Sequence, residues 1–446
     1  MRPIIPRQER VGVGIADGFS RNRRGKQIGV FAAQHGPGIE NAFAGVAQAY
    51  SENVPLLVIP AGFPPSRQHT QPTFRAAEVF KPVTKYTAMA HTVEDLPDTM
   101  RRAYQALRSG KGGPVLVEIP TNVFEANFEG NLDYHPVPVQ RTAPDPDAIK
   151  QAAKMLLSAR HPIIWAGQGV LYAEASEQLL ALAELAGAPI VMTNPGKGAV
   201  PESHPLALGA STRSRPKMYQ HFMNKADLIL AIGSSMTRTS FGPPIPIGKT
   251  IVHSTNDPSD INKDCRADHS IVGDAGLVTD ALIAEVDSLR SAPNIGIEEL
   301  KAEIAAIKAE WHAEWSAQFK SDEVPINQYR VLGELLQTVD RDNSIVTHDS
   351  GSPREQTLPF WETTKAGGYM GWGKSTQLGY GLGIAMGAKL AAPDKQCINI
   401  MGDSAFGMTG MDIETASRCG IAIMTVVFNN SVMAAERDVL KISNEK

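Results

Sequence analysis

The stretch that most constrains the fold lies near the end of the chain, at residues 397–430. The apolar segments 397–401 and 421–428 read as buried strands, and residues 406–419 between them read as a helix that Gly420 ends. This strand–helix–strand order predicts two parallel strands whose carboxyl ends meet at one edge of a sheet. Open α/β sheets bind their ligands at that edge.

Polar side chains follow both predicted strands. Asp403 comes after the first strand, and Asn429 and Asn430 come after the second. Carboxylate and carboxamide oxygens are hard ligands that suit Mg²⁺, and the amides of Ser404 and Ala405, near a helix start, suit a diphosphate. The pattern therefore predicts a site for a metal ion and a diphosphate. The alternative is an ordinary strand–helix–strand unit with a chance aspartate.

Gly402-Asp403-Ser404, with Asn430 27 positions after Asp403, resembles the motif of the thiamine diphosphate (ThDP) enzyme family. In that family Gly-Asp-Gly is followed after a set interval by Asn-Asn, and this interval is usual in the acetolactate synthase-like and 2-oxo acid decarboxylase branch. Ser404 replaces the second glycine of the motif, as it does in oxalyl-CoA decarboxylases. The subfamily therefore stays open.

This resemblance implies ThDP and Mg²⁺ as cofactors. The metal ligands it implies are Asp403, Asn430 and Val432. The residues of this stretch expected to bind the cofactor are Gly402, Asp403, Ser404, Ala405 and Asn430.

Composition narrows the range of partners. The chain has 43 basic and 47 acidic residues and a formal net charge of −4, which does not point to nucleic acid or to an anionic membrane. No apolar run has the length of a transmembrane helix, and Cys265, Cys397 and Cys419 show no metal-ligand spacing. We therefore expect a soluble, cytoplasmic protein without disulfides that acts on small molecules.

Strands and helices alternate through three blocks of the 446-residue sequence, which is long enough for two or three domains. We predict parallel-sheet α/β domains at 1–128, 145–290 and 325–446, with a proline-containing linker at 134–146 and an amphipathic helix at 297–319. The order resembles the pyrimidine-binding, central and diphosphate-binding domains of ThDP enzymes. By that resemblance, the first domain lacks an initial strand and helix, and the last lacks a segment after the Asn-Asn loop.

Residues 7–21 resemble the family's Arg-His-Glu segment and the helix after it, with Gln8 in place of the histidine. The resemblance places Glu9 at the glutamate that hydrogen-bonds the aminopyrimidine ring. A carboxyl group there favours the imino tautomer, whose exocyclic nitrogen takes the C2 proton. A solvated surface carboxylate is the alternative. In the family this glutamate and the metal site come from different subunits, so a homodimer or homotetramer with shared active sites is implied.

Gln34 and His35 precede a Gly-Pro-Gly sequence at 36–38. This loop resembles the family's Gly-Pro-Gly loop beside the substrate, where Gln34 or His35 would donate to the bound intermediate or exchange a proton with it. The alternative is a tight turn that only starts a helix, with His35 on the surface.

Residues 373–381 form a glycine-rich segment before a helix of small residues. By resemblance, Leu378 is the apolar residue that wedges between the two cofactor rings and brings the exocyclic nitrogen to C2. Thr376 and Gln377 would then lie beside the cofactor. Core packing is the alternative for Leu378.

The central block, 145–290, contains no complete Gly-x-Gly-x-x-Gly phosphate loop. Some relatives bind FAD in this domain and others bind a nucleotide or nothing, so FAD has no motif to support it. We expect this domain to space and orient the other two. The missing fingerprint also disfavours an NAD-dependent dehydrogenase.

These features favour a ThDP- and Mg²⁺-dependent enzyme that cleaves or forms a carbon–carbon bond next to a carbonyl. The expected reaction is acetolactate synthase-like decarboxylation of a 2-oxo acid, with or without carboligation. An acyl-CoA lyase such as oxalyl-CoA decarboxylase is one alternative, and a non-catalytic ThDP-fold binding protein is another. Glu436 and Arg437, beyond the Asn-Asn loop, are expected to be solvated.

Overall fold

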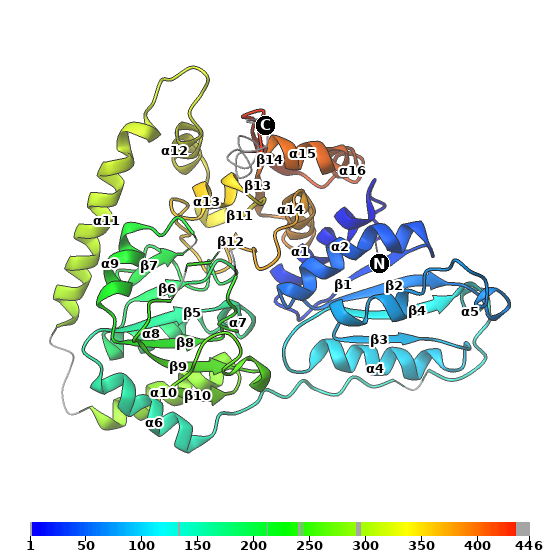
Figure 1. Cartoon of the computed structure of the whole chain (residues 1–446), viewed down its shortest axis with the longest axis horizontal. Coiled ribbons are helices and arrows are strands. Elements are labelled where there is room, and N and C mark those ends of the chain that lie inside the picture. Colours follow the sequence, from blue (N-terminus) through cyan, green and yellow to red (C-terminus); the bar gives the residue numbers. More distant parts are fainter. Residues whose placement is uncertain are drawn as a thin grey trace, which may run out of the picture. The chain divides into compact units, whose positions relative to one another are not determined.

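The computed structural model describes residues 2–132, 134–211, 213–239, 242–243, 245–290 and 296–433. The chain forms two compact units, whose elements are labelled in Figure 1. The first comprises Met1–Gln140, Asp349–Gly351 and Ser375–Lys446, and the second comprises Arg141–His348 and Ser352–Lys374. Glu436 and Arg437 lie outside the described residues.

The first unit contains a four-stranded parallel sheet with the strand order β1-β2-β4-β3. Its strands are β1 (Gly29–Ala33), β2 (Leu56–Gly62), β3 (Tyr86–Met89) and β4 (Val115–Pro120). The helices around it are α1 (Glu9–Asn22), α2 (Pro37–Ser51), η1 (Pro65–Arg67), α3 (Ala76–Val79), η2 (Lys81–Val83), α4 (Leu96–Arg108) and α5 (Thr121–Phe124). In Figure 1, α1 and α2 lie over one face of this sheet and α4 over the other.

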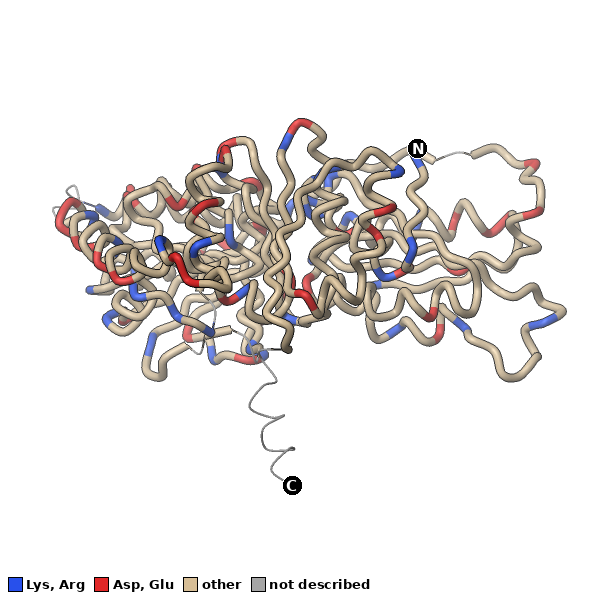
Figure 2. Tube along the Cα trace, turned by 90° about the horizontal axis from the view of Figure 1, so that it is seen from above, with Lys and Arg blue, Asp and Glu red and all other residues tan. Residues whose placement is uncertain are grey.

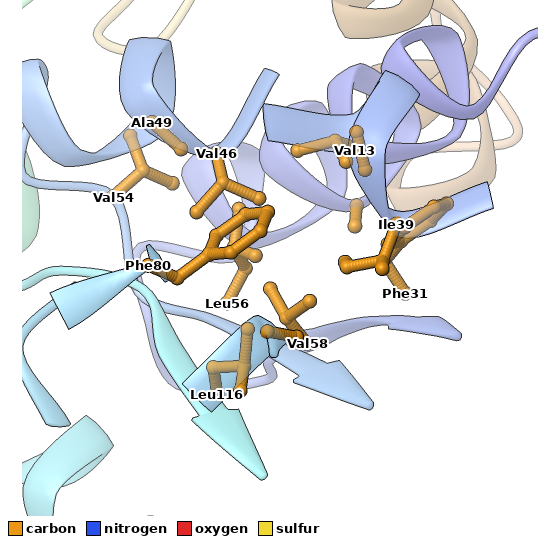
Figure 3. Packing of buried hydrophobic residues seen from close by; sticks show 13 residues of the cluster. Val13, Phe31, Ile39, Val46, Ala49, Val54, Leu56, Val58, Phe80 and Leu116 are labelled. Carbon is orange, nitrogen blue, oxygen red and sulfur yellow. The ribbon is translucent and has the colours of Figure 1, made fainter. Parts of the chain in front are cut away.

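Alternation along the strands explains the two layers. Leu56 and Val58 of β2 point with Ile39 and Val46 of α2 into one core, shown in Figure 3. Leu57, between them in the sequence, packs in the second core with side chains of α4. Because neighbouring strand residues face opposite sides, an apolar run such as β2 is the sequence expected for a strand buried on both faces.

The carboxyl-terminal part of the first unit contributes a helix and a strand–helix–strand segment. Its elements are α14 (Tyr380–Ala391), β13 (Gln396–Gly402), α15 (Asp403–Thr409), η5 (Gly410–Asp412), α16 (Ile413–Arg418) and β14 (Ile423–Phe428). β13 and β14 pair in parallel, as the sequence predicts. α14 packs closely against α1 through glycines on both helices, including Gly14 and Gly383.

The second unit contains a six-stranded parallel sheet with the order β10-β9-β8-β5-β6-β7, in which the first strand, β5, lies in the middle beside β8. This is a doubly wound order. Its strands are β5 (Pro162–Ala166), β6 (Ile190–Met192), β7 (Ala207–Ala210), β8 (Leu228–Ile232), β9 (Thr250–Thr255) and β10 (His269–Val272). Its helices are α6 (Pro146–Ser158), α7 (Gln168–Tyr172), α8 (Ser176–Ala186), α9 (Lys217–Lys225), η3 (Pro258–Asp260) and α10 (Ala275–Leu289).

The rest of the second unit begins with the predicted connecting helix, α11 (Ile297–Phe319). Trp311 and Trp315 of α11 pack with Tyr329 and Phe360 in an aromatic cluster. The other elements are α12 (Gln328–Thr338), η4 (Arg341–Asn343), β11 (Ser344–His348), α13 (Ser352–Thr357) and β12 (Tyr369–Met370). β11 and β12 pair in parallel.

Acidic and basic residues are interspersed along the chain (Figure 2), in line with the net charge of −4. Within the described ranges, no helix is both long enough and apolar enough to cross a membrane. Cys265, Cys397 and Cys419 are free cysteines.

Candidate functional site

The register of β13 and β14 defines the edge at which Asp403 lies. The last parallel pair joins Gly402 to Phe428, so Asp403 and Asn429 each directly follow the same rung of the sheet. Asp403 is half-buried and Asn429 and Asn430 are exposed. A carboxylate and two carboxamides are therefore brought to one sheet edge, as the strand order predicts.

The helix after β13 differs from the prediction at its start and in its interior. It begins at Asp403, three residues before the predicted start, and a 3₁₀ turn at Gly410–Asp412 divides the predicted helix into α15 and α16. Gly402 is extended and caps the helix, while an acidic first residue suits the positive end of the helix dipole. Gly410 weakens the helix at the break because glycine has low helix propensity.

The amides of Ser404 and Ala405 therefore belong to the first turn of α15, where main-chain N–H groups have no partner within the helix. Ala405 is buried and Ser404 is half-buried. Their role beside a diphosphate stays a prediction.

The Asn-Asn loop is shaped by its own side chains. Asn429 Oδ1 accepts hydrogen bonds from Ser431 N (3.2 Å) and Ser431 Oγ (3.3 Å), and Asn430 Oδ1 accepts one from Val432 N (3.1 Å). Such local bonds fix a turn because the side chain replaces a main-chain acceptor. A carboxamide oxygen has two lone pairs, so Asn430 keeps acceptor capacity beyond this bond.

Leu378 lies in a tightly held turn. Thr376, Gln377 and Leu378 are half-buried, while Gly379 is buried and caps α14 with a φ of 84°. Gly379 accepts this left-handed conformation because it has no Cβ. The main chain at Leu378 is therefore fixed, and its side chain is only half-buried. Its predicted contact with the cofactor stays a prediction.

Two residues that hold this turn, Asp349 and Gln48, were not predicted from the sequence. The Asp349 carboxylate accepts from Gly379 N and Gly381 N, each at 2.9 Å. Gln48 Oε1 accepts from Gln377 N at 3.1 Å. The sequence does carry a signal for Asp349, because this residue directly follows the buried strand β11. Asp403 directly follows the strand β13 in the same way.

Glu9 is the first residue of α1 and is half-buried. Its Oε2 accepts a hydrogen bond from Asn41 Nδ2 at 3.3 Å. Among the described residues, no hydrogen bond joins Glu9 to Asp403 or Asn430. The structure thus brings Asp403, Asn429 and Asn430 to one sheet edge, while the predicted role of Glu9 stays a prediction.

The Gly-Pro-Gly loop lies at the carboxyl end of β1. Gly36 has a φ of 66° and caps α2, which begins at Pro37. Gln34 is exposed, and the His35 ring stacks on Phe63 with 4.4 Å between the ring centroids. The tight turn is therefore real, and the catalytic roles of Gln34 and His35 stay predictions.

Within the described part of the chain, no three His, Cys, Asp or Glu side chains gather into a metal-binding group. The predicted ligand set of one carboxylate, one carboxamide and one main-chain carbonyl is of a different kind. In the second unit, a Cβ added to Gly167 or Gly169 would lie 2.3 Å or 2.7 Å from the main chain of Gly233. These glycines therefore serve close packing of strand-end loops, and FAD gains no support from them.

Comparison with known proteins identifies the class. Three family models match the chain: "Thiamine pyrophosphate enzyme, N-terminal TPP binding domain" over residues 1–82, the central domain over 149–282 and the C-terminal TPP binding domain over 349–445. This confirms the predicted fold class of three parallel-sheet α/β domains.

Relatives narrow the branch within that class. Two probable acetolactate synthase large subunits, from Methanococcus aeolicus and Methanocaldococcus jannaschii, are each 30% identical over 96% of this chain and 74% of the relative. Acetolactate synthase isozyme 3 large subunit of Escherichia coli is 28% identical over 96% of this chain and 75% of the relative. The chain belongs to the ThDP-dependent enzyme family and is acetolactate synthase-like.

Proposed function

We propose that this enzyme uses ThDP with Mg²⁺ to decarboxylate a 2-oxo acid, with or without joining the product to a second carbonyl compound. The observation that carries the proposal is the register of β13 with β14, which sets Asp403 and the Asn-Asn loop at one sheet edge. The matching relatives are named as acetolactate synthases, which supports the same reaction class.

The residues at this edge fit a magnesium diphosphate. The Asp403 carboxylate, the Asn430 carboxamide and the Val432 main-chain carbonyl are hard oxygen donors of the kind that Mg²⁺ prefers. The first-turn amides of Ser404 and Ala405 supply donors for phosphate oxygens. ThDP, when bound, supplies a carbon nucleophile and an electron sink for cleavage next to a carbonyl.

The remaining predicted residues divide the work of orientation and proton transfer. Leu378, in its fixed turn, would hold the two rings of the cofactor at the required angle, with Thr376 and Gln377 alongside. Glu9 would hold a proton at the pyrimidine ring nitrogen. Gln34 and His35 would donate hydrogen bonds to the substrate side.

The proposed enzyme is a homodimer or homotetramer that acts in the cytoplasm. The match of residues 1–82, which include Glu9, to the N-terminal TPP binding domain supports the family's arrangement, in which active sites are completed between subunits of a homodimer or homotetramer. The three free cysteines suit the reducing cytoplasm.

The test is incubation with ThDP, Mg²⁺ and a panel of 2-oxo acids, with CO₂ release and covalent adducts measured by mass spectrometry. We expect turnover of at least one 2-oxo acid and its loss in Asp403→Ala. Asp394→Ala is the matched control, because Asp394 is an exposed aspartate before β13. Turnover that survives Asp403→Ala would contradict the metal assignment.

A second candidate is a CoA-thioester lyase, favoured by Ser404 at the third position of the motif. Adding oxalyl-CoA to the same panel separates the two. Turnover of the thioester without turnover of any 2-oxo acid would replace the first proposal, and ThDP binding without any turnover would favour a non-catalytic binding protein.

A further inference from the structure

The carboxylate of Asp349 accepts two hydrogen bonds from the turn that carries Leu378. Its Oδ1 accepts from Gly379 N and its Oδ2 accepts from Gly381 N, both at 2.9 Å. Ser350 N also donates to Oδ1, at 2.8 Å. Asp349 has no exposed surface, so these three amides replace the water that a carboxylate otherwise binds.

The main chain of Asp349 is tied to the strand that leads to Asp403. Asp349 N donates to Ile400 O at 2.7 Å, and Ile400 lies on β13, which ends at Gly402. Asp349 thus holds the Leu378 turn with its side chain and β13, the strand that leads to Asp403, with its main-chain N–H. The two elements are thus joined through hydrogen bonds of ordinary length.

A second bridge runs from the other end of α15. Thr409 is buried, and its Oγ1 lies 3.2 Å from Gly379 O and 3.3 Å from Ala405 O, so the two carbonyl oxygens share its one hydroxyl proton. A Cβ added to Gly379 would lie 2.6 Å from Thr409 Cγ2, so the two segments are in close contact. The helix that begins at Asp403 therefore also fixes the Leu378 turn.

We propose that Asp349 is a positioning residue for cofactor activation, which fixes the main chain beside Leu378 so that this side chain holds the two rings of ThDP in the reactive geometry. The inference rests on the proposed function. It assigns a role to a residue outside the Gly-Asp-Ser and Asn-Asn segments, and it explains why a carboxylate is kept where its burial is unfavourable.

The requirement for a carboxylate follows from the hydrogen-bond inventory. Two main-chain amides approach two different oxygens, and an asparagine offers one acceptor oxygen and one NH₂ group. In Asp349→Asn, an amide N–H of Gly379 or Gly381 would therefore face another donor, and the turn would shift to separate them. Burial raises the pKa of Asp349 to about 6. The hydrogen bonds from the three main-chain N–H groups and the positive charge of Arg10 oppose that rise. The carboxylate is thus largely ionised at neutral pH.

The experiment measures hydrogen–deuterium exchange at C2 of ThDP bound to the full chain, at saturating ThDP and Mg²⁺. We expect Asp349→Asn to slow this exchange by roughly 10- to 100-fold, because a displacement of about 1 Å at a reacting centre has an effect of that order. Thr409→Val keeps the side-chain shape but removes the bond to Gly379 O, and we expect a smaller decrease.

Glu118→Gln is the matched control. Glu118 is also buried in the first unit, and its Oε2 also accepts a main-chain amide, from Ala77 at 2.8 Å. Burial raises the pKa of this carboxyl group as well. A general effect of removing a buried charge would slow exchange in both variants, whereas a positioning role of Asp349 leaves the Glu118→Gln rate unchanged.

An Asp349→Asn protein that is folded and exchanges C2–H at the wild-type rate would overturn the inference, even if its thermal stability had changed. If that variant does not fold, Asp349→Glu decides: it keeps the carboxylate but lengthens the side chain by one methylene, which displaces the turn, and a wild-type exchange rate there would overturn the inference equally. Wild-type protein that does not accelerate exchange above free ThDP would overturn the proposed function together with the positioning role. The two failures are therefore distinguishable.

Discussion

The contact between α1 and α14 gives a sharp prediction for Gly387→Ala. A Cβ at Gly387 would lie 2.1 Å from Ile15 O and 2.6 Å from Phe19 N, and one at Gly18 would lie 2.2 Å from Ile384 O. The obstructing atoms are main-chain atoms, so no side-chain rotation relieves the overlap. The two helices must separate to accept a methyl group.

The magnitude follows from two opposing effects. Alanine in place of glycine inside a helix gains about 1 kcal/mol in propensity. Overpacking a tight interface costs about 3 kcal/mol when the neighbours cannot move aside. We therefore expect a net loss of about 2 kcal/mol in the local stability of α1 and α14. This corresponds to roughly 30-fold faster amide exchange when opening is the limiting equilibrium.

The assay is amide hydrogen exchange followed by mass spectrometry, which resolves the peptides of α1 and α14 from those of the second unit. Gly407→Ala is the control, because Gly407 lies in α15 and a Cβ there meets no atom within 4 Å. We expect no faster exchange in that variant. Unchanged or slower exchange in α1 and α14 of Gly387→Ala would refute the steric reasoning.

Three further predictions concern charged side chains. Glu9→Gln should slow C2–H exchange of bound ThDP strongly while leaving ThDP affinity, measured by calorimetry, largely intact. An unchanged exchange rate in this variant would contradict the role of Glu9. Lys197→Met should lower the free energy of unfolding by about 3–5 kcal/mol, because Glu202 stays buried after losing its ion-pair partner. In the wild type, Lys197 Nζ lies 2.5 Å from Glu202 Oε1. The double variant Lys197→Met/Glu202→Leu should recover most of that loss in thermal unfolding. Asp349, with a pKa raised to about 6 from 3.8, favours the folded state as pH falls from about 6 to 4, and this contribution is lost as pH rises through 6. Unfolding free energies of wild type and Asp349→Asn should therefore diverge by about 3 kcal/mol across that range, and parallel pH profiles would refute the raised pKa.

The sheet edge at Asp403 was predictable because the sequence signal for it is local. Two apolar segments, a helix between them and polar residues after each are enough to predict parallel strands with Asp403 and Asn429 at one edge. The helix start was wrong by three residues because Asp403-Ser404-Ala405 read as a loop, whereas the extended Gly402 lets Asp403 begin the helix.

The support of the Leu378 turn could not be predicted in the same way. Gln48 contacts Gln377 from 329 positions away, and Thr409 contacts Gly379 from 30 positions away. No period or spacing encodes such contacts. Asp349 is the exception, because an aspartate directly after a buried strand is the same pattern that identified Asp403.

The most direct test of the central claim is calorimetric titration of the full chain with ThDP, with and without Mg²⁺. We expect ThDP binding that requires Mg²⁺, is lost in Asp403→Ala and is retained in Asp394→Ala. Absence of ThDP binding, or binding that is equally tight without Mg²⁺ and in Asp403→Ala, would contradict it.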